Sequence, residues 1–212
     1  MKVVKLSVVL LLICAVVAGI LGGVNAITEE RIASQKAQKA REAYEAVLLA
    51  DTYEPLDFDK SQFPTVTEVV RAGGGHVVKL VFSGAQGSIT MAVGIDENLR
   101  CTGISIIDHS ETSGLGANAA ADSEVGRHFR EQFIGQEASI ALSTQGGDID
   151  ALTGATITTT AVVKAVATAI AAAAAERGVD VSAVLSDQGA EINALTGATI
   201  TTSASAEGGE AA

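Results

Sequence analysis

The sequence predicts an α+β fold in which a single N-terminal transmembrane helix and a stalk helix precede an antiparallel-sheet domain. Three observations predict it. An uncharged apolar run occupies residues 6–24, three segments rich in β-branched residues lie between residues 76 and 107, and an alanine-rich helical pattern covers residues 160–177. Strand segments at hairpin spacing pair antiparallel, which gives the sheet of the α+β class.

Composition limits the functions that this chain can have. With 212 residues, it is long enough for one folded domain with appendages or for two small domains. The net charge of −11 argues against a nucleic-acid partner, because phosphate binding needs clustered Lys and Arg. Cys14 and Cys101 are too few for a disulfide scaffold or a cysteine-ligated iron–sulfur cluster. The histidines have no ligand spacing, so we predict no metal site, and no catalytic triad or carboxylate pair is evident.

Residues 1–26 are predicted to be a membrane anchor. At about 1.5 Å per residue, the run 6–24 is roughly 28 Å long, close to the hydrocarbon thickness of a bilayer. Val24-Asn25-Ala26 resembles a cleavage site, so a removed signal peptide is the alternative. We favour a retained helix because the apolar run is longer than the usual core of a signal peptide.

The orientation in the membrane rests on two opposing signals. More Lys and Arg residues follow the span than precede it, which by count alone would place the main domain inside. Residues 51–212, however, carry far more acidic than basic groups, and an acidic domain is translocated without penalty. We therefore expect a single-pass protein of the cell (inner) membrane whose main domain is extracytoplasmic.

Residues 27–50 are predicted to form a stalk helix. Ala, Glu, Lys, Gln and Arg dominate the segment, and all are strong helix formers. Thr28 is the expected N-cap, with Glu29 and Glu30 in the first turn. Small and apolar residues make a stripe that suits packing on the domain. A lipid-surface or calmodulin-binding helix is the alternative.

Residues 51–180 are predicted to form the sheet domain. Pro55 and Pro64 indicate that residues 51–67 are a loop with short extended pieces. Strands are expected at residues 76–83, 88–95 and 101–107.

A polar loop and two helices follow the predicted strands. The loop is expected at residues 109–121 and a short helix at residues 122–133. The long helix at residues 160–177 is expected to have its N-cap at Thr158 or Thr159 and Gly178 as its C′ residue.

A short motif, Asp150-Ala151-Leu152-Thr153-Gly154-Ala155-Thr156, lies just before the long helix. Gly154 and Ala155 keep bulk away from the neighbouring hydroxyl groups. Thr156 presents an oxygen where free N–H groups and the helix dipole favour a phosphate. Further hydroxyl donors are expected from Thr153, Thr158, Thr159 and Thr160. No His or Lys adjoins Thr156, so it is not a self-activating nucleophile. The residues alone leave open an anion site and a plain threonine-rich helix cap.

This motif resembles the Asp-x-x-Ser/Thr-Gly-Ala-Thr attachment motif of the FMN-binding domain family. The family includes the G subunits of Rnf ion-translocating oxidoreductases and the C subunits of sodium-translocating NADH:quinone reductases. In these proteins a separate flavin transferase joins FMN through its phosphate to the final threonine. The resemblance implies a covalent FMN phosphoester at Thr156 and cofactor contacts from Thr153, Gly154 and Ala155. It also implies that the transferase recognises Asp150.

Two further patches strengthen the resemblance. Residues 109–116, His-Ser-Glu-Thr-Ser-Gly-Leu-Gly, resemble the His-x-Glu-Thr-Pro-Gly-Leu-Gly loop of Rnf G subunits, with Ser113 where Pro is usual. Residues 129–135 resemble the Phe-x-x-Gln-Phe-x-Gly that follows it. With the N-terminal span, the resemblance covers residues 1–177 and favours the G subunits over the C subunits.

Four residues of the 109–116 loop are candidate flavin contacts. Glu111 and Thr112 are candidates for hydrogen bonds to the isoalloxazine edge. Leu115 is a candidate to pack on the ring face, and Gly114 would let the backbone approach the ring. Plain loop geometry is the alternative for each.

The resemblance implies an electron-transfer subunit without independent catalysis. Its complex would couple ferredoxin and NAD redox chemistry to Na⁺ or H⁺ translocation. The implied partners are the membrane, the other subunits of the complex and a flavin transferase during maturation. A free-standing anchored or secreted flavoprotein that passes electrons to an extracellular acceptor is the first alternative, and a non-redox module without flavin is the second.

Residues 181–212 are predicted to be a tail that holds a second copy of the motif. Residues 194–202 repeat the sequence ALTGATITT of residues 151–159, which indicates a duplication. Thr199 is thus a possible second FMN attachment site. Asn193 stands where the first copy has Asp150, so we expect poorer labelling there. A duplication without a role and a second, mobile flavin both remain open, and the small, acidic residues 203–212 are expected to be disordered.

Overall fold

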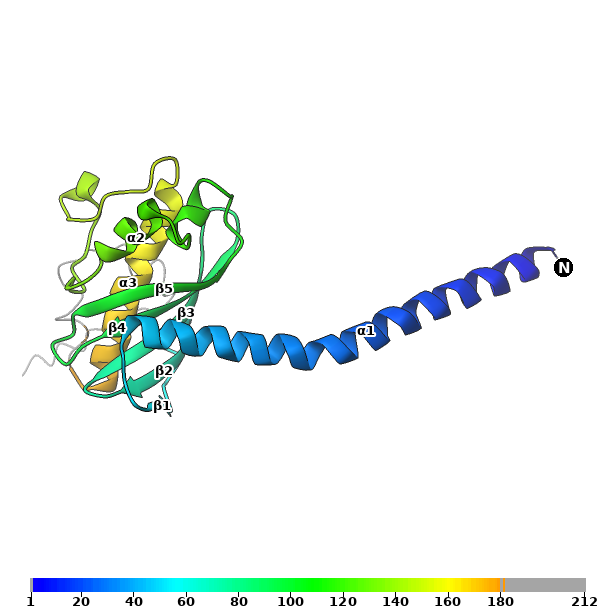
Figure 1. Cartoon of the computed structure of the whole chain (residues 1–212), viewed down its shortest axis with the longest axis horizontal. Coiled ribbons are helices and arrows are strands. Elements are labelled where there is room, and N and C mark those ends of the chain that lie inside the picture. Colours follow the sequence, from blue (N-terminus) through cyan, green and yellow to red (C-terminus); the bar gives the residue numbers. More distant parts are fainter. Residues whose placement is uncertain (1, 180, 182–212) are drawn as a thin grey trace, which may run out of the picture. The chain divides into compact units, whose positions relative to one another are not determined.

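The structure, a computed structural model, describes residues 2–179 and residue 181 (Figure 1). It divides into two units, residues 1–41 and residues 42–212. The elements in chain order are α1 (Lys2–Val47), β1 (Tyr53–Leu56), β2 (Val66–Ala72), β3 (Gly75–Ser83), β4 (Ser88–Ile95), β5 (Cys101–His109), the 3₁₀ helix η1 (Gly116–Ala119), α2 (Glu124–Glu131), the 3₁₀ helix η2 (Ser143–Gln145) and α3 (Thr156–Glu176).

Residues 2–41 of the first unit are all helical, because α1 continues without a break across the predicted boundary between anchor and stalk. The Thr28 hydroxyl donates to the carbonyl of Val24, one turn earlier, at 2.8 Å. That bond places Thr28 inside the helix, so the prediction of an N-cap there is wrong. Strong helix formers on both sides of Thr28 leave nothing to stop the helix.

Two helical stretches among the described residues are long and apolar enough to cross a membrane. One is Ser7–Val47 of α1, whose most apolar window is 0% buried in this structure. The other is α3, whose window is 78% buried and which is the core helix of the second unit. An unburied apolar helix near the N-terminus is compatible with the predicted anchor.

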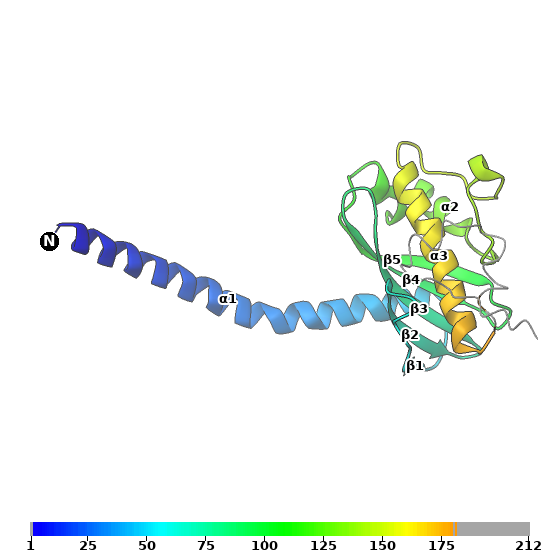
Figure 2. The ribbon, with the colours of Figure 1, turned by 180° about the vertical axis from the view of Figure 1, so that it is seen from behind.

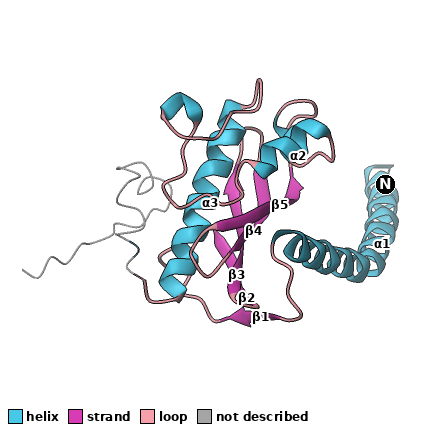
Figure 3. Cartoon of the chain, turned by 60° about the vertical axis from the view of Figure 1, so that its left-hand side comes forward, coloured by secondary structure: helices cyan, strands magenta, loops and turns pink. Residues whose placement is uncertain are grey.

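The second unit is built on an antiparallel sheet of strand order β1-β2-β3-β4-β5 (Figure 3). The three predicted strands are confirmed as β3, β4 and β5. β1 and β2 extend the sheet, and β1 is one of the short extended pieces expected within residues 51–67. Pro55 is tolerated in β1 because this edge strand pairs on one side only, with β2.

The central strands are buried on both faces. On one face Val69, Val78, Val93 and Ile104 are cross-strand neighbours in the main hydrophobic core, which also contains most of α3. Figure 2 shows α3 lying across this face of the sheet. Half of its buried residues are alanine, which lets the helix approach the strands closely.

The end of α1 covers part of the opposite face. Thr102 of β5 donates its hydroxyl to the carbonyl of Val47 at 2.5 Å, and a Cβ on Gly94 would collide with the same carbonyl. The Tyr44 hydroxyl donates to Glu68 at 2.9 Å. Burial raises the pKa of Tyr44, and the neighbouring Glu68 carboxylate raises it further.

The predicted helices are present, with one correction at a boundary. α2 is confirmed, and its N-cap Ser123 accepts a hydrogen bond from the Gly126 N–H at 3.2 Å. α3 begins at Thr156 with Ala155 as its N-cap, so the N-cap prediction of Thr158 or Thr159 is wrong. Gly178 has a φ of +69° and follows the C-cap Arg177, which confirms it as the C′ residue.

Candidate cofactor site

The 150–156 motif folds into a tight turn that ends at the N-terminus of α3. The Ala155 N–H donates to the carbonyl of Leu152 at 2.9 Å, and Gly154 between them has a φ of +73°. Only glycine adopts this φ without strain, which explains the residue type. The Asp150 N–H donates to the Gln132 side chain at 2.7 Å and ties the start of the turn to the end of α2.

The N-terminus of α3 carries no side-chain cap. Ala155 cannot supply one, and the first turn contains no acidic residue. The first N–H groups of a helix have no intrahelical acceptor and carry the positive end of its dipole. Thr156 is exposed at the first helical position, so its hydroxyl lies beside these donors.

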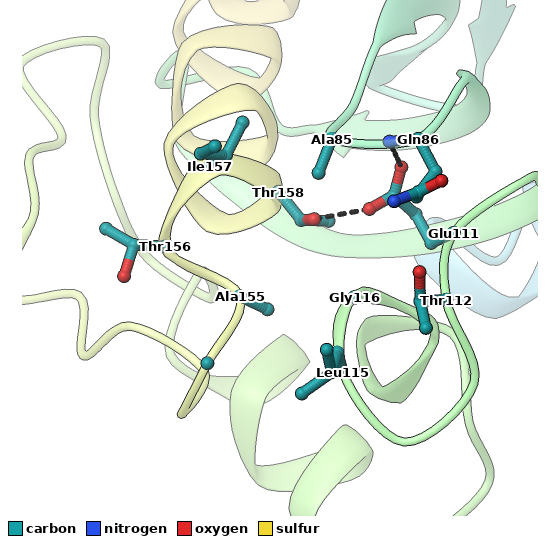
Figure 4. A pocket seen from close by; sticks show the side chains of 11 residues that line it. Ala85, Gln86, Glu111, Thr112, Leu115, Gly116, Ala155, Thr156, Ile157 and Thr158 are labelled. Atoms are coloured by element: carbon teal, nitrogen blue, oxygen red, sulfur yellow. Dashed lines mark hydrogen bonds between the residues drawn. The ribbon is translucent and has the colours of Figure 1, made fainter.

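A cavity of ≈ 410 Å³ opens beside Thr156 (Figure 4). Its lining comes from the β3–β4 turn, from the loop after β5 and from the start of α3. The lining residues are Ala85, Gln86, Glu111, Thr112, Leu115, Gly116, Gly154, Ala155, Thr156, Ile157 and Thr158. The large apolar side chains of Leu115 and Ile157 are 44% and 69% exposed, so the lining presents apolar surface to a ligand.

Glu111 supplies the negative charge of the lining. Its Oε1 accepts the Gln86 N–H at 3.0 Å, and its Oε2 accepts the Thr158 hydroxyl at 2.5 Å. Burial raises the pKa of the carboxyl, but hydrogen bonds from Thr158 and from the N–H groups of the 85–87 turn outweigh burial and hold the pKa below its usual value. The carboxylate is therefore ionised at neutral pH.

The loop that carries Glu111 and Leu115 is held by α2. The half-buried Arg130 guanidinium donates to the carbonyls of Ala119 and Ala121 at 2.8 and 3.0 Å. The Asn118 side chain donates to the carbonyl of Gly114 at 3.0 Å, within the loop. Arg130 belongs to the 129–135 patch of the sequence. Through its hydrogen bonds, that patch holds the loop that contains the 109–116 patch.

Six of the residues singled out in the sequence meet at this cavity: Gly154, Ala155, Thr156, Glu111, Thr112 and Leu115. Asp150, Thr153 and Gly114 are exposed nearby and do not line it. Thr199 lies outside the described residues. Among the described residues, no group of three His, Cys, Asp or Glu side chains is arranged to hold a metal.

Sequence reasoning missed the wall formed by Ala85 and Gln86, and it gave Ile157 no role. A signal for that wall was present in the sequence. In an antiparallel meander the β3–β4 turn and the end of β5 lie at the same end of the strands. The 84–87 turn therefore had to lie near the 109–116 loop.

The cavity and its surroundings fit FMN. Its volume falls within the range of about 300–1,000 Å³ that is typical of small-molecule sites. Leu115, Ala155 and Ile157 offer apolar surface for a flat ring, while Thr112 and Gln86 offer polar groups. The uncapped helix N-terminus suits a phosphate, and Thr156 is both the first residue of that helix and one of the lining residues.

Comparison with known proteins agrees with this geometry. A family described as "FMN-binding domain" matches residues 84–171, and one described as "RnfG N-terminal region" matches residues 1–47. The G subunit of an ion-translocating oxidoreductase complex of Methanosarcina acetivorans is 32% identical over 188 residues, which cover 84% of this chain and 97% of that protein.

Bacterial relatives show the same likeness. The G subunit of the same name from Escherichia coli K12 is 30% identical over 76% of this chain and 86% of its own length. The G subunit of a proton-translocating ferredoxin:NAD(+) oxidoreductase complex of Clostridium ljungdahlii is 37% identical over 45% of this chain and 51% of its own length. This chain, with its FMN-binding domain and its RnfG-type N-terminal region, therefore belongs to the family of G subunits of ion-translocating oxidoreductase complexes.

Proposed function

We propose that the protein is the flavin-carrying electron-transfer subunit of an Rnf-type ferredoxin:NAD oxidoreductase that drives Na⁺ or H⁺ translocation. Its FMN is joined covalently through the phosphate to the hydroxyl oxygen of Thr156. The observation that carries this proposal is the position of Thr156, which is exposed at the uncapped N-terminus of α3 and is one of the residues that line the ≈ 410 Å³ cavity. FMN accepts one or two electrons, which suits a carrier between one-electron and two-electron partners.

The residues of the chain bind and orient the cofactor in this proposal. The N–H groups at the start of α3 receive the phosphate, because nothing in the helix itself accepts their hydrogen bonds. Leu115 and Ala155 pack against the ring, and Thr112 supplies a hydroxyl near its edge. Thr153 and Gly154, in the turn before α3, complete the immediate surroundings of the attachment point.

Attachment needs a separate flavin transferase. The eleven lining residues include no Lys, Arg or His, and the one carboxylate among them, that of Glu111, accepts hydrogen bonds from Gln86 and Thr158 and not from the Thr156 hydroxyl. Asp150 is exposed at the entrance to the turn, where the transferase can reach it. The transferase must take FMN from a donor whose flavin phosphate carries a leaving group, such as a flavin dinucleotide. The Thr156 oxygen loses its proton and forms the new oxygen–phosphorus bond as the bond from that phosphorus to the leaving group breaks, and the leaving group takes up the proton. The chain therefore gains the mass of FMN less one water.

Intact-mass spectrometry of the chain produced with its transferase tests the proposal. We expect one FMN less one water on the wild-type chain and its loss in Thr156→Ala. Thr144→Ala is the matched control, because it removes an exposed threonine hydroxyl that lies outside the motif and does not line the cavity. Full flavin on Thr156→Ala that is released on denaturation would contradict covalent attachment at this residue.

We also propose that the protein spans the cell (inner) membrane once through the N-terminal part of α1 and that its flavin domain is extracytoplasmic. The exposed apolar residues before Ile27 support the span, and the acidic character of the domain supports its export. A covalent link has a physical reason at that location, because a dissociated FMN would be lost by dilution outside the membrane.

A further inference from the structure

One carboxylate connects two walls of the cavity. Glu111 follows β5, and its N–H donates to the imidazole Nδ1 of His109 at 3.3 Å. Its two carboxylate oxygens accept from Gln86 in the β3–β4 turn and from Thr158 in the first turn of α3, as the dashed lines in Figure 4 show. The side chain thus reaches one wall with each oxygen.

The packing around Glu111 leaves room for the carboxylate and for little else. A Cβ on Gly84 would overlap Oε1, and a Cβ on Gly116 would overlap Oε2 and the Thr158 hydroxyl. Glycines on both sides therefore admit the carboxylate. Both oxygens of the Glu111 carboxylate accept hydrogen bonds from the protein. The two walls therefore fix the position of the carboxylate without a ligand.

We propose that Glu111 is a positioning residue that holds together the 84–87 turn and the first turn of α3, two neighbouring walls of the cavity. This role differs from direct hydrogen bonding to a flavin edge. Thr158 is its partner in α3, and Gln86 is its partner in the turn. Where the cavity holds a flavin, a point that rests on the proposed function, the fixed negative charge also opposes the addition of electrons to the ring.

Hydrogen exchange of the flavin-free full-length chain in detergent micelles tests the connection between the walls. Thr158→Val removes the hydroxyl and keeps the carboxylate charge, whereas Thr158→Ser keeps the hydroxyl. We expect Thr158→Val to speed exchange of the Gln86 amide, on the neighbouring wall, about tenfold, because a carboxylate that has lost one anchor protects its other partner less. Thr158→Ser should stay within about twofold of wild type.

Glu111→Gln provides a second variant, since an amide has one acceptor oxygen where the carboxylate has two. We expect faster exchange at Gln86 in this variant also. Unchanged Gln86 exchange in both Thr158→Val and Glu111→Gln would overturn the proposal. Neither measurement needs a flavin, so a failure here is distinct from a failure to find FMN on Thr156.

The flavin-loaded protein gives a readout that a purely structural role would not move. We expect the flavin midpoint potential to shift to a more positive value in Glu111→Gln. Asp108→Asn is the charge-matched control, because Asp108 is exposed on β5 and its carboxylate accepts the backbone N–H of the next residue. A shift of equal size in both variants would show a general surface-charge effect and would contradict the electrostatic part of the proposal.

Discussion

The Leu152 N–H donates to the hydroxyl of Thr159 at 3.1 Å, and this hydroxyl donates in turn to the carbonyl of Ala155 at 3.0 Å. One buried threonine in the first turn of α3 therefore fixes the shape of the attachment turn before it. Thr159 is fully buried, and its hydrogen bonds hold in place the turn that carries the exposed Thr156.

The Thr159 bonds predict a stability effect. Thr159→Val keeps the shape but leaves the Leu152 N–H buried without an acceptor, so we expect the free energy of unfolding to fall by about 1–3 kcal/mol. Thr160→Val is the matched control, because the half-buried Thr160 hydroxyl donates only to the carbonyl of Thr156. It should change stability by less than about 0.5 kcal/mol. Denaturant unfolding followed by circular dichroism checks both, and equal effects would refute the role of Thr159.

Gly154 predicts an effect on flavin attachment. Gly154→Ala places a Cβ at a φ of +73° and 3.0 Å from Leu115, so both the turn and the cavity wall must shift. Gly135→Ala is the control, because its φ is +82° but nothing lies within 4 Å of the added Cβ. We expect both variants to lose about 1 kcal/mol of stability or more. Only Gly154→Ala should lower FMN incorporation by mass spectrometry, and equal incorporation in both variants would contradict the importance of the Leu115 contact.

The sequence predicts those parts of the site whose residues are contiguous in the chain, and it misses the parts that tertiary structure brings together. The 150–156 motif and the 109–116 loop are contiguous segments, so their residues were identified from the sequence. The wall at Gln86 depends on strand register, and the bond from Thr158 to Glu111 joins residues 47 positions apart. Such pairings are set by tertiary structure rather than by a local pattern.

The same reasoning explains the errors in the fold. Thr158 and Thr159 were predicted as caps because threonine favours that position. Both residues instead lie inside α3, which begins at Thr156. The Thr158 hydroxyl donates to Glu111, and the Thr159 hydroxyl donates to the carbonyl of Ala155. Residues 51–67 were predicted as a loop with short extended pieces; one such piece is β1, which pairs with β2 and accommodates Pro55 because it is an edge strand.

His76 predicts a pH dependence of stability. Burial lowers its pKa, the positive charges of Arg177 and Arg71 lower it further, and Glu176 opposes them. The folded state thus prefers neutral His76, whereas the unfolded chain protonates it near its ordinary pKa. This contribution to stability is complete above the unfolded pKa and is lost as the pH falls below it.

His76→Gln tests this dependence. The variant should lose less stability than wild type between pH 8 and pH 5, and exposed His128→Gln should behave like wild type. The test is to measure the free energy of unfolding of all three proteins across this pH range. Parallel curves of this free energy against pH would show that His76 contributes nothing to the pH dependence of stability.

The proposed topology predicts protease access. Arg31, Lys36, Lys39 and Arg41 are exposed on α1. Trypsin added to intact spheroplasts should therefore cut this segment and release the flavin domain, while a cytoplasmic marker protein stays intact. Protection in spheroplasts with cleavage in inverted vesicles would place the domain inside, as the count of basic residues suggests.

The last prediction concerns the repeated motif. Thr199 lies outside the described residues, so the comparison with Thr156 rests on sequence. Asn193 replaces the carboxylate of Asp150, and the residues that follow Thr202 are small and acidic, where the first copy continues into the helix-forming residues of α3. A helix N-terminus favours a phosphate, and the second copy has no sequence that predicts one. We therefore expect FMN on nearly all Thr156 and on little or none of Thr199.

Peptide mapping of one digest compares the two threonines directly. Asn193→Asp restores the carboxylate of the second copy and should raise labelling of Thr199 if the transferase reads that residue. Asp150→Asn makes the reciprocal change and should lower labelling of Thr156. Near-complete FMN on Thr199 in the wild-type chain would overturn the ranking, because it would show that neither the acidic residue nor the helix after the motif is needed for attachment.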